Sequence, residues 1–133
     1  MRVISLVLTI FSIAIFSFSC DTDNDLDLEE GTYKGTFTAN YSSGAQTGQT
    51  TLKLKDGRFS CSGNSNRIPA GGSGTYSFDN GKITFNDENF WTADFDWNVV
   101  LSGRYKYVID GEKLKMSDDE SSVGLYIYDL ERQ

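Results

Sequence analysis

The chain of 133 residues contains no histidine, one proline and two cysteines. Without histidine it cannot form the Ser–His or Cys–His pairs of nucleophilic catalysis, and it lacks the commonest zinc ligand. Basic residues are also scarce, since 12 Lys and Arg face 19 Asp and Glu, for a formal charge of −7. A surface this acidic repels phosphate backbones, so we expect no nucleic-acid partner. We also expect no enzymatic activity, no catalytic residue, no cofactor and no bound metal ion.

Long apolar runs are missing except at the N-terminus, where Arg2 precedes a nearly unbroken apolar segment from Val3 to Phe18, followed by Ser19 and Cys20. A basic start, an apolar middle and small residues before the cleavage site are typical of a secretory signal peptide. We predict that residues 1–19 are removed and that Cys20 becomes the first residue of the mature chain. In bacterial lipoproteins this cysteine carries several acyl chains, and two or more buried chains anchor a protein stably. The pattern therefore predicts a lipidated Cys20 that holds the protein on a membrane.

Two alternatives for this N-terminal segment stay open. Ordinary signal cleavage would leave Cys20 as a free thiol, and an uncleaved segment would span the membrane. A spanning helix needs about 20 apolar residues. The run here is shorter, and Ser5, Thr9, Ser12 and Ser17 interrupt it.

An acidic stretch follows, in which Asp21–Glu30 holds six carboxylates in ten residues. This density of charge, with little apolar area, favours a solvated, disordered tether over residues 20–30. Removal of residues 1–19 leaves 11 basic and 19 acidic residues, for a formal charge of −8. An acidic tract after a lipidated cysteine favours the outer membrane of a Gram-negative bacterium, with exposure at the cell surface as an open alternative. Asp21 alone would instead favour retention in the inner membrane.

The sequence from Gly31 to Gln133 is typical of an all-β protein, because no window shows a sustained helical period. The pairs Asp56-Gly57, Asn80-Gly81 and Asp110-Gly111 predict tight hairpin turns. The segments around them predict eight or nine short strands, which include Thr32–Asn40, Thr51–Lys55, Phe95–Leu101, Arg104–Ile109, Glu112–Met116 and Val123–Leu130. A sheet of many short sequential strands usually resolves its edges by closing. We predict a small antiparallel up-and-down barrel over residues 31–133, with the last strand beside the first.

Three segments carry a family resemblance: Gly31-Thr32-Tyr33 at the first strand, the run Asn66–Tyr76 and the run Phe90–Trp97. Together with the cysteine signal and the acidic tether, they resemble the small lipocalin-like lipoproteins of Gram-negative bacteria over nearly the whole chain. The resemblance implies a lipocalin-like barrel in the cell envelope and no particular activity. Tyr33 stands where lipocalins have a tryptophan, and no helix follows the last strand. With a domain of about 103 residues, which can fill its own barrel, these departures argue against a lipocalin-style cavity.

Aromatic and acidic residues concentrate in the segment 87–97. On an extended strand one face would carry Phe95, Trp97, Val99 and Leu101, and the other would carry Asp94, Asp96 and Asn98. The structural interpretation is a row of core aromatics backed by a solvated acidic face. The functional alternatives are a calcium site or a sugar-stacking platform, in which Trp91 and Trp97 hold a ring while Asp94 and Asp96 bind its hydroxyl groups.

The longest irregular stretch, Ser62–Ser73, contains glycines together with Arg67. Glycine amides and Arg67 could bind an anion, although no Lys-Ser or Lys-Thr pair follows as in a phosphate loop. A surface loop is the simpler interpretation. In a barrel that binds a ligand, this loop would form part of the rim.

The second cysteine, Cys61, falls on the same strand face as Phe59 if Arg58–Cys61 is extended. A small buried apolar residue is the simplest interpretation of this cysteine. The alternatives are a disulfide between Cys20 and Cys61 and a reactive thiol.

These observations favour a membrane-anchored extracytoplasmic lipoprotein whose small barrel has a non-enzymatic binding or envelope role. One alternative is an inhibitor of a hydrolase of the lysozyme or protease type, because an acidic surface steers basic enzymes. Another is a carrier of a small apolar ligand. The partners that follow are the membrane, through Cys20, and a small apolar ligand, a glycan or a basic protein.

Overall fold

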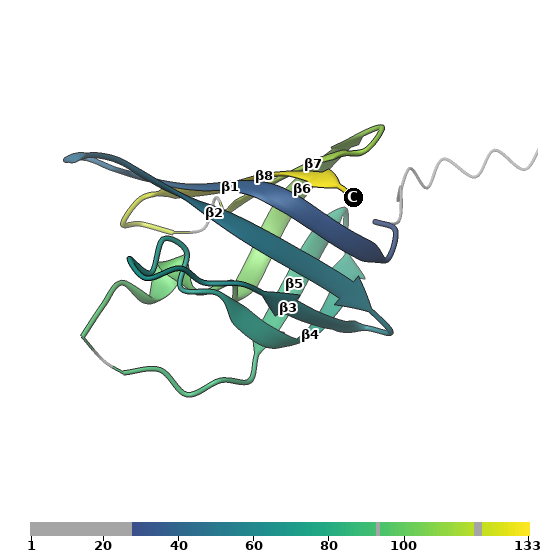
Figure 1. Cartoon of the computed structure of the whole chain (residues 1–133), viewed down its shortest axis with the longest axis horizontal. Coiled ribbons are helices and arrows are strands. Elements are labelled where there is room, and N and C mark those ends of the chain that lie inside the picture. The colour runs from purple at the N-terminus through teal and green to yellow at the C-terminus, as the bar shows by residue number, and fades with distance from the viewer. Residues whose placement is uncertain (1–27, 93, 119–120) are drawn as a thin grey trace, which may run out of the picture.

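The computed structural model describes residues 28–92, 94–118 and 121–133. It is a closed barrel of eight antiparallel strands in sequential order, in which β8 also pairs with β1 (Figure 1). The predicted small, lipocalin-like all-β barrel is therefore confirmed. The strands are β1 (Gly31–Tyr41), β2 (Gly44–Lys55), β3 (Arg58–Cys61), β4 (Gly72–Asp79), β5 (Lys82–Asp87), β6 (Gly103–Asp110), β7 (Lys113–Asp118) and β8 (Leu125–Arg132), with a short 3₁₀ helix η1 (Trp97–Val99) between β5 and β6.

The predicted signal segment 1–19 and Cys20 lie outside the described residues. Within the described ranges, no helix has both the length and the apolar character that a membrane span requires.

The alternation of the connections defines two ends of the barrel. The turn end carries the tight turns β2–β3, β4–β5 and β6–β7. The loop end carries the connections β1–β2, β3–β4, β5–β6 and β7–β8 (Figure 1). At the turn end, two predicted hairpins are confirmed, because Asp56-Gly57 and Asn80-Gly81 both adopt the paired positive φ angles of a type I′ turn, between 51° and 74°.

The third predicted turn is shifted by one residue. Asp110 pairs with Lys113 and belongs to β6, so Gly111-Glu112 forms the loop instead of Asp110-Gly111. Gly111 has a φ of 59°, and a glycine at the first loop position suits a type II′ turn.

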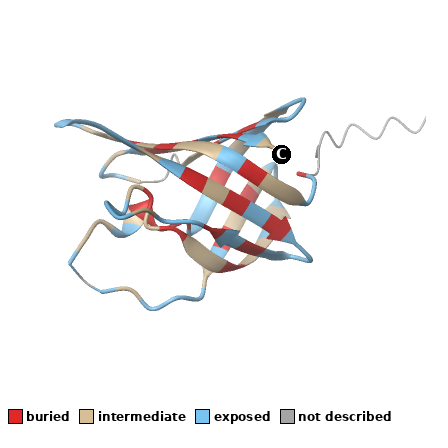
Figure 2. Ribbon diagram, viewed as in Figure 1, coloured by how far each residue is buried: buried red, intermediate tan, exposed pale blue. Residues whose placement is uncertain are grey.

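Aromatic side chains fill the barrel interior. Ring contacts run from Phe37 on β1 to Tyr128 on β8 at 4.7 Å between centroids, from Tyr128 to Tyr105 on β6 at 5.8 Å, and from Tyr105 to Phe85 on β5 at 5.9 Å. Phe59 on β3 closes the series against Phe85 at 4.9 Å. Figure 2 shows the resulting alternation of buried and exposed residues along the strands. A barrel of eight strands is just wide enough for side chains to fill it, and here they do.

The packed domain begins before Gly31, where the predicted tether was expected to end. Leu28 is buried in the core cluster. Glu29 forms an ion pair of 2.6 Å with Arg132, and Glu30 accepts a hydrogen bond of 2.7 Å from the backbone amide of Asp56. Burial of one apolar side chain and these contacts attach residues 28–30 to the turn end, so they are not part of a solvated tether.

The predicted strand Phe95–Leu101 is wrong. Asp96 caps η1, where its side chain accepts a hydrogen bond of 3.0 Å from the backbone amide of Asn98. Such local bonds compete with sheet pairing. The predicted shared face holds only in part, because Val99 and Leu101 are buried whereas Trp97 is 55% exposed.

Candidate functional site

The candidate site lies at the loop end. It combines the β3–β4 connection (62–71), the β5–β6 connection (88–102) and the adjoining part of the β1–β2 hairpin. The turn end, in contrast, has a cavity of about 240 Å³ between the β6–β7 turn and the chain's own N-terminal residues Leu28 and Glu29. Among the described residues, none of the ligand-binding residues proposed from the sequence lines that second cavity, so the loop end is the better candidate.

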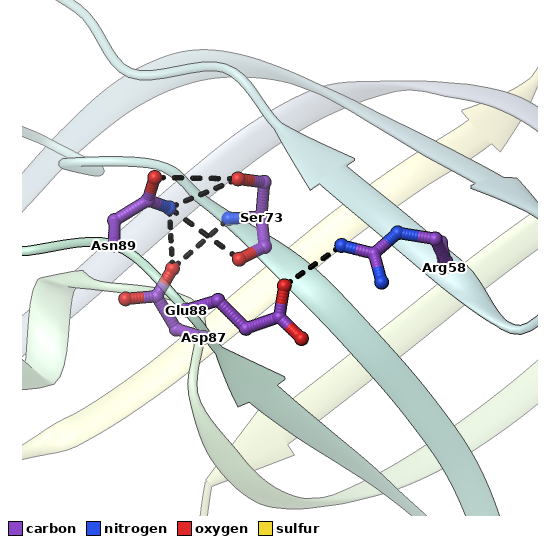
Figure 3. A network of polar contacts seen from close by, with 5 residues as sticks. All are labelled: Arg58, Ser73, Asp87, Glu88 and Asn89. Carbon is purple, nitrogen blue, oxygen red and sulfur yellow. Dashed lines mark hydrogen bonds and ion pairs between the residues drawn. The ribbon is translucent and has the colours of Figure 1, made fainter.

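Hydrogen bonds fix the start of the β5–β6 connection to β4. Asp87 accepts a bond of 2.9 Å from the amide of Ser73 and one of 2.7 Å from the Asn89 side chain (Figure 3). The neighbouring Glu88 pairs with Arg58 on β3 at 2.7 Å (Figure 3). The first acidic residues of the segment therefore anchor the connection to the barrel.

Trp91 belongs to the same anchor. Its indole N–H donates a bond of 2.5 Å to the second carboxylate oxygen of Asp87. Its ring packs edge-to-face on Phe95, with 5.9 Å between centroids. Trp91 is thus half-buried and supports the Phe95 ring. Its indole N–H group is bonded to Asp87 and is not free for a ligand.

Arg67 reaches across from the β3–β4 connection to this aromatic pair. Its guanidinium lies 4.7 Å from the centre of the Phe95 ring, and it forms an ion pair of 3.6 Å with Asp94. The ion pair is exposed and contributes little to stability. A hydrogen bond from Thr92 is the main cause that lowers the pKa of Asp94.

The backbone of the β3–β4 connection is shaped to present Arg67. The side-chain oxygen of Asn64 accepts bonds from the amides of Asn66 at 3.1 Å and Ile68 at 3.0 Å. Between them, Arg67 has a φ of 54°, a left-handed conformation that is unfavourable for a residue with a side chain. The connection also packs on β2 so closely that a Cβ at Gly48 would overlap the carbonyl oxygen of Ile68.

Asp96 ties the other side of the site to the barrel. Its Oδ2 atom accepts hydrogen bonds from the hydroxyls of Tyr41 at 2.6 Å and Tyr126 at 2.8 Å. Burial alone would raise the pKa of Asp96, but the bonds from Tyr41, Asn98 and Tyr126 together lower it. Burial and the bond to Asp96 raise the pKa of Tyr41. Asp96 is therefore a charged acceptor held in place by two phenol groups.

These elements enclose a groove of about 290 Å³. Its walls combine two aromatic rings, one cation, one carboxylate, two side-chain amides and two aliphatic groups, from Tyr41, Gln46, Asn66, Arg67, Ile68, Phe95, Asp96 and Val99. Such a mixture of apolar surface with a few polar groups is typical of small-molecule sites.

The structure brings together some of the residues proposed from the sequence. Arg67 and Asp96 line the groove, Asp94 contacts Arg67, and Trp91 supports Phe95 from behind. Trp97 is outside the groove, where its indole N–H donates to the carbonyl of Thr92 at 3.1 Å. The predicted platform of two tryptophans is therefore not formed.

Six of the eight groove residues escaped the sequence analysis as ligand contacts: Tyr41, Gln46, Asn66, Ile68, Phe95 and Val99. Tyr41 and Gln46 lie about fifty residues before Asp96 in the sequence, and only barrel closure brings them near it. The local signals were the position of Asn66 beside Arg67 in an irregular, glycine-containing stretch and that of Phe95 between Asp94 and Asp96.

The carboxylates of the segment 87–97 bind different partners, so they do not converge on a common point. Across the described ranges, no group of three or more His, Cys, Asp or Glu side chains is placed to hold a metal ion. The arrangement suits reversible binding through hydrogen bonds and ring contacts.

No protein-family model, no curated protein and no solved structure matches this chain. The resemblance to small lipocalin-like lipoproteins therefore stays a prediction beyond the fold itself.

Proposed function

We propose that the protein is a lipid-anchored extracytoplasmic binding module without enzymatic activity, and that its loop-end groove binds a carbohydrate. The observation that carries this proposal is the Phe95 ring beneath Arg67, beside the side-chain amides of Gln46 and Asn66. A sugar presents C–H groups that pack on an aromatic ring and hydroxyl groups that both donate and accept hydrogen bonds. Arg67 donates, Asp96 accepts, and each amide does both.

The filled interior favours this external site over an internal cavity. The ring series from Phe37 to Phe59 occupies the centre of the barrel. An apolar ligand would have to displace these rings, and close-packed cores resist added volume. We therefore favour carbohydrate binding at the groove over transport of an apolar ligand inside the barrel.

Membrane attachment belongs to the same proposal. The predicted signal ends at Cys20, and the described chain begins at Leu28 on the turn end. An anchor on that side leaves the groove on the opposite end of the barrel, away from the attachment point. Palmitate labelling tests this part: the wild-type protein incorporates label and stays with the membrane fraction, whereas Cys20→Ala does neither. Equal membrane retention of both proteins would contradict it.

The groove is tested by NMR saturation transfer from the full-length protein in detergent to a panel of neutral soluble oligosaccharides. We expect Phe95→Ala and Arg67→Ala each to weaken binding at least about tenfold, which corresponds to roughly 1.4 kcal/mol. Phe90→Ala is the matched control, because Phe90 lies on the same connection, is fully exposed and does not line the groove. The absence of any bound oligosaccharide, or an equal loss with Phe90→Ala, would contradict carbohydrate binding at this site.

One observation favours inhibition of a basic hydrolase as a second candidate function. Phe90 is fully exposed on the long β5–β6 connection of a chain with a formal charge of −7. Aromatic side chains are enriched in protein interfaces, where they act as anchors. This function predicts salt-sensitive inhibition of a lysozyme that Phe90→Ala abolishes and Phe95→Ala leaves largely intact, the reverse of the pattern for carbohydrate binding.

A further inference from the structure

One strand edge of the barrel is only partly covered. β2 pairs with β1 from Gly44 to Leu54, but with β3 only from Leu52 to Lys55. At the next residue, the amide of Ser62 donates to the carbonyl of Thr51 at 2.9 Å, after which the β3–β4 connection leaves the sheet. The edge from Gly44 to Gln49 thus lies beyond the end of β3, and Figure 1 shows the tip of this hairpin projecting from the barrel.

The backbone groups that point out of this edge follow from the geometry of a strand. Successive residues of an antiparallel strand direct their N–H and C=O groups to opposite sides. Thr51 directs both groups toward Ser62, since its own amide donates to the Ser62 hydroxyl at 2.8 Å. Ala45, Thr47 and Gln49 share this orientation, and in the described part of the chain no β3 residue pairs with them.

The edge lacks two of the usual protections against pairing. Natural edge strands avoid association through charged residues, proline, bulges or short length. Between Lys34 and Lys53 there is no charged residue and no proline. Residues 44–47 and Gln49 are exposed, and the tip is pale blue in Figure 2.

The charge pattern indicates what pairs with this edge. Two copies of a chain with a formal charge of −7 repel one another over most of their surfaces. The uncharged hairpin is a surface across which two copies approach without placing like charges opposite each other. Antiparallel pairing is also self-complementary, because a two-fold axis brings the same segment against itself.

We propose that the β2 edge from Gly44 to Gln49 pairs antiparallel with the same edge of a second copy and joins two barrels in a dimer. A two-fold axis through Thr47 places the two Thr47 side chains opposite each other, and threonine pairs are a favourable cross-strand combination. The paired segment is short, so the contact is weak in dilute solution. Confinement to a membrane raises the effective concentration and favours the dimer there.

The first test uses disulfide formation in membranes from cells that express the full chain. Single cysteines replace Ala45, Gln46 or Thr47, and Val108→Cys is the control, because Val108 is 66% exposed on β6. We expect a disulfide-linked dimer with at least one of the three edge variants, most rapidly for the residue on the two-fold axis, and none with Val108→Cys. Cross-linking no faster than in the Val108→Cys control would overturn the proposal.

The second test measures the mass of the wild-type protein in density-matched detergent by analytical ultracentrifugation over a wide concentration range. Thr47→Pro removes one outward N–H group, which an edge strand tolerates, and we expect it to be monomeric with an unchanged melting temperature. Thr47→Lys adds a charge at the same position and provides a second monomeric variant should proline perturb the hairpin. A wild-type protein that stays monomeric at every concentration, or variants that dimerise as the wild type does, would refute edge pairing.

Discussion

The hydroxyl of Tyr126 donates a hydrogen bond of 2.8 Å to Oδ2 of Asp96 and thereby ties the β5–β6 connection to β8. Tyr41 donates to the same oxygen at 2.6 Å from β1. One carboxylate thus joins three elements that are far apart in the sequence. Because Asp96 also lines the groove, its ionisation state affects both the stability of the connection and the shape of the site.

Acid should therefore loosen the β5–β6 connection. The folded protein lowers the pKa of Asp96 below its ordinary value of 3.8. The stabilisation is then fully present above pH 3.8 and is lost as the pH falls through the folded pKa. We expect Asp96→Asn to lower the free energy of unfolding at pH 7 by about 1–2 kcal/mol and to reduce its acid dependence. Urea unfolding at pH 7 and below pH 4 measures both effects.

Asp79→Asn provides the control for this experiment, because Asp79 is exposed at the end of β4. Its unfolding curves should match those of the wild type at pH 7. An Asp96→Asn protein with unchanged stability at that pH would show that the two tyrosine bonds do not secure the connection.

Much of the barrel was predictable because its signals are local. The turn pairs at Asp56 and Asn80 fix positive φ angles within a few residues, and β7 alternates regularly between exposed and buried residues. The first half of β2 was missed, since residues 44–47 are all exposed and have no buried face to produce an alternating pattern. That segment is a strand only because β1 pairs with it along its whole length.

The candidate site was only partly predictable, because its residues come from distant parts of the sequence. Arg67 and Asp96 were found through their residue types. Their partner Tyr41 could not be assigned, because no local pattern reveals which strands meet at the loop end. Phe95 lies next to Asp96 in the sequence but was interpreted as a core aromatic. The misassigned strand around Asp96 shows the same limit, since hydrogen bonds to Tyr41 and Tyr126 from distant strands hold a turn where alternation predicted an extended segment.

Replacement of Arg67 by glycine should separate stability from binding. Arg67 has a φ of 54°, which glycine adopts without strain, although glycine also increases the entropy of the unfolded chain. We expect the free energy of unfolding to change by less than about 1 kcal/mol. Oligosaccharide affinity, measured by NMR titration, should fall at least about tenfold. Arg67→Lys keeps a cation and should retain more affinity than Arg67→Gly; equal affinity for the wild type and Arg67→Gly would remove the guanidinium from the proposed site.

Cys61 should be unreactive in the folded protein. It is a buried free thiol among the described residues, which confirms its predicted burial, and its sulfur lies 3.2 Å from the hydroxyl of Thr50. Burial raises the pKa of Cys61 to about 11, so little of the reactive thiolate is present at pH 8.

In a Cys20→Ala background, a thiol reagent such as DTNB should label Cys61 only after denaturant is added. Val108→Cys in the same background supplies an exposed thiol that reacts at once. Rapid labelling of the native Cys20→Ala protein would contradict the inert role of Cys61.

Two buried tyrosine hydroxyls, those of Tyr105 and Tyr128, have no hydrogen-bond partner among the described residues. Their rings contact each other in the barrel centre at 5.8 Å between centroids. A buried hydroxyl without a partner loses its bonds to water and gains none in return.

We therefore expect Tyr128→Phe and Tyr105→Phe to leave the free energy of unfolding unchanged or to raise it by up to about 1 kcal/mol. Tyr126→Phe, which loses the bond to Asp96, should lower it by about 1 kcal/mol. Urea unfolding of the three variants gives the comparison, and a loss of more than about 1 kcal/mol for Tyr128→Phe would mean that internal water bonds to its hydroxyl.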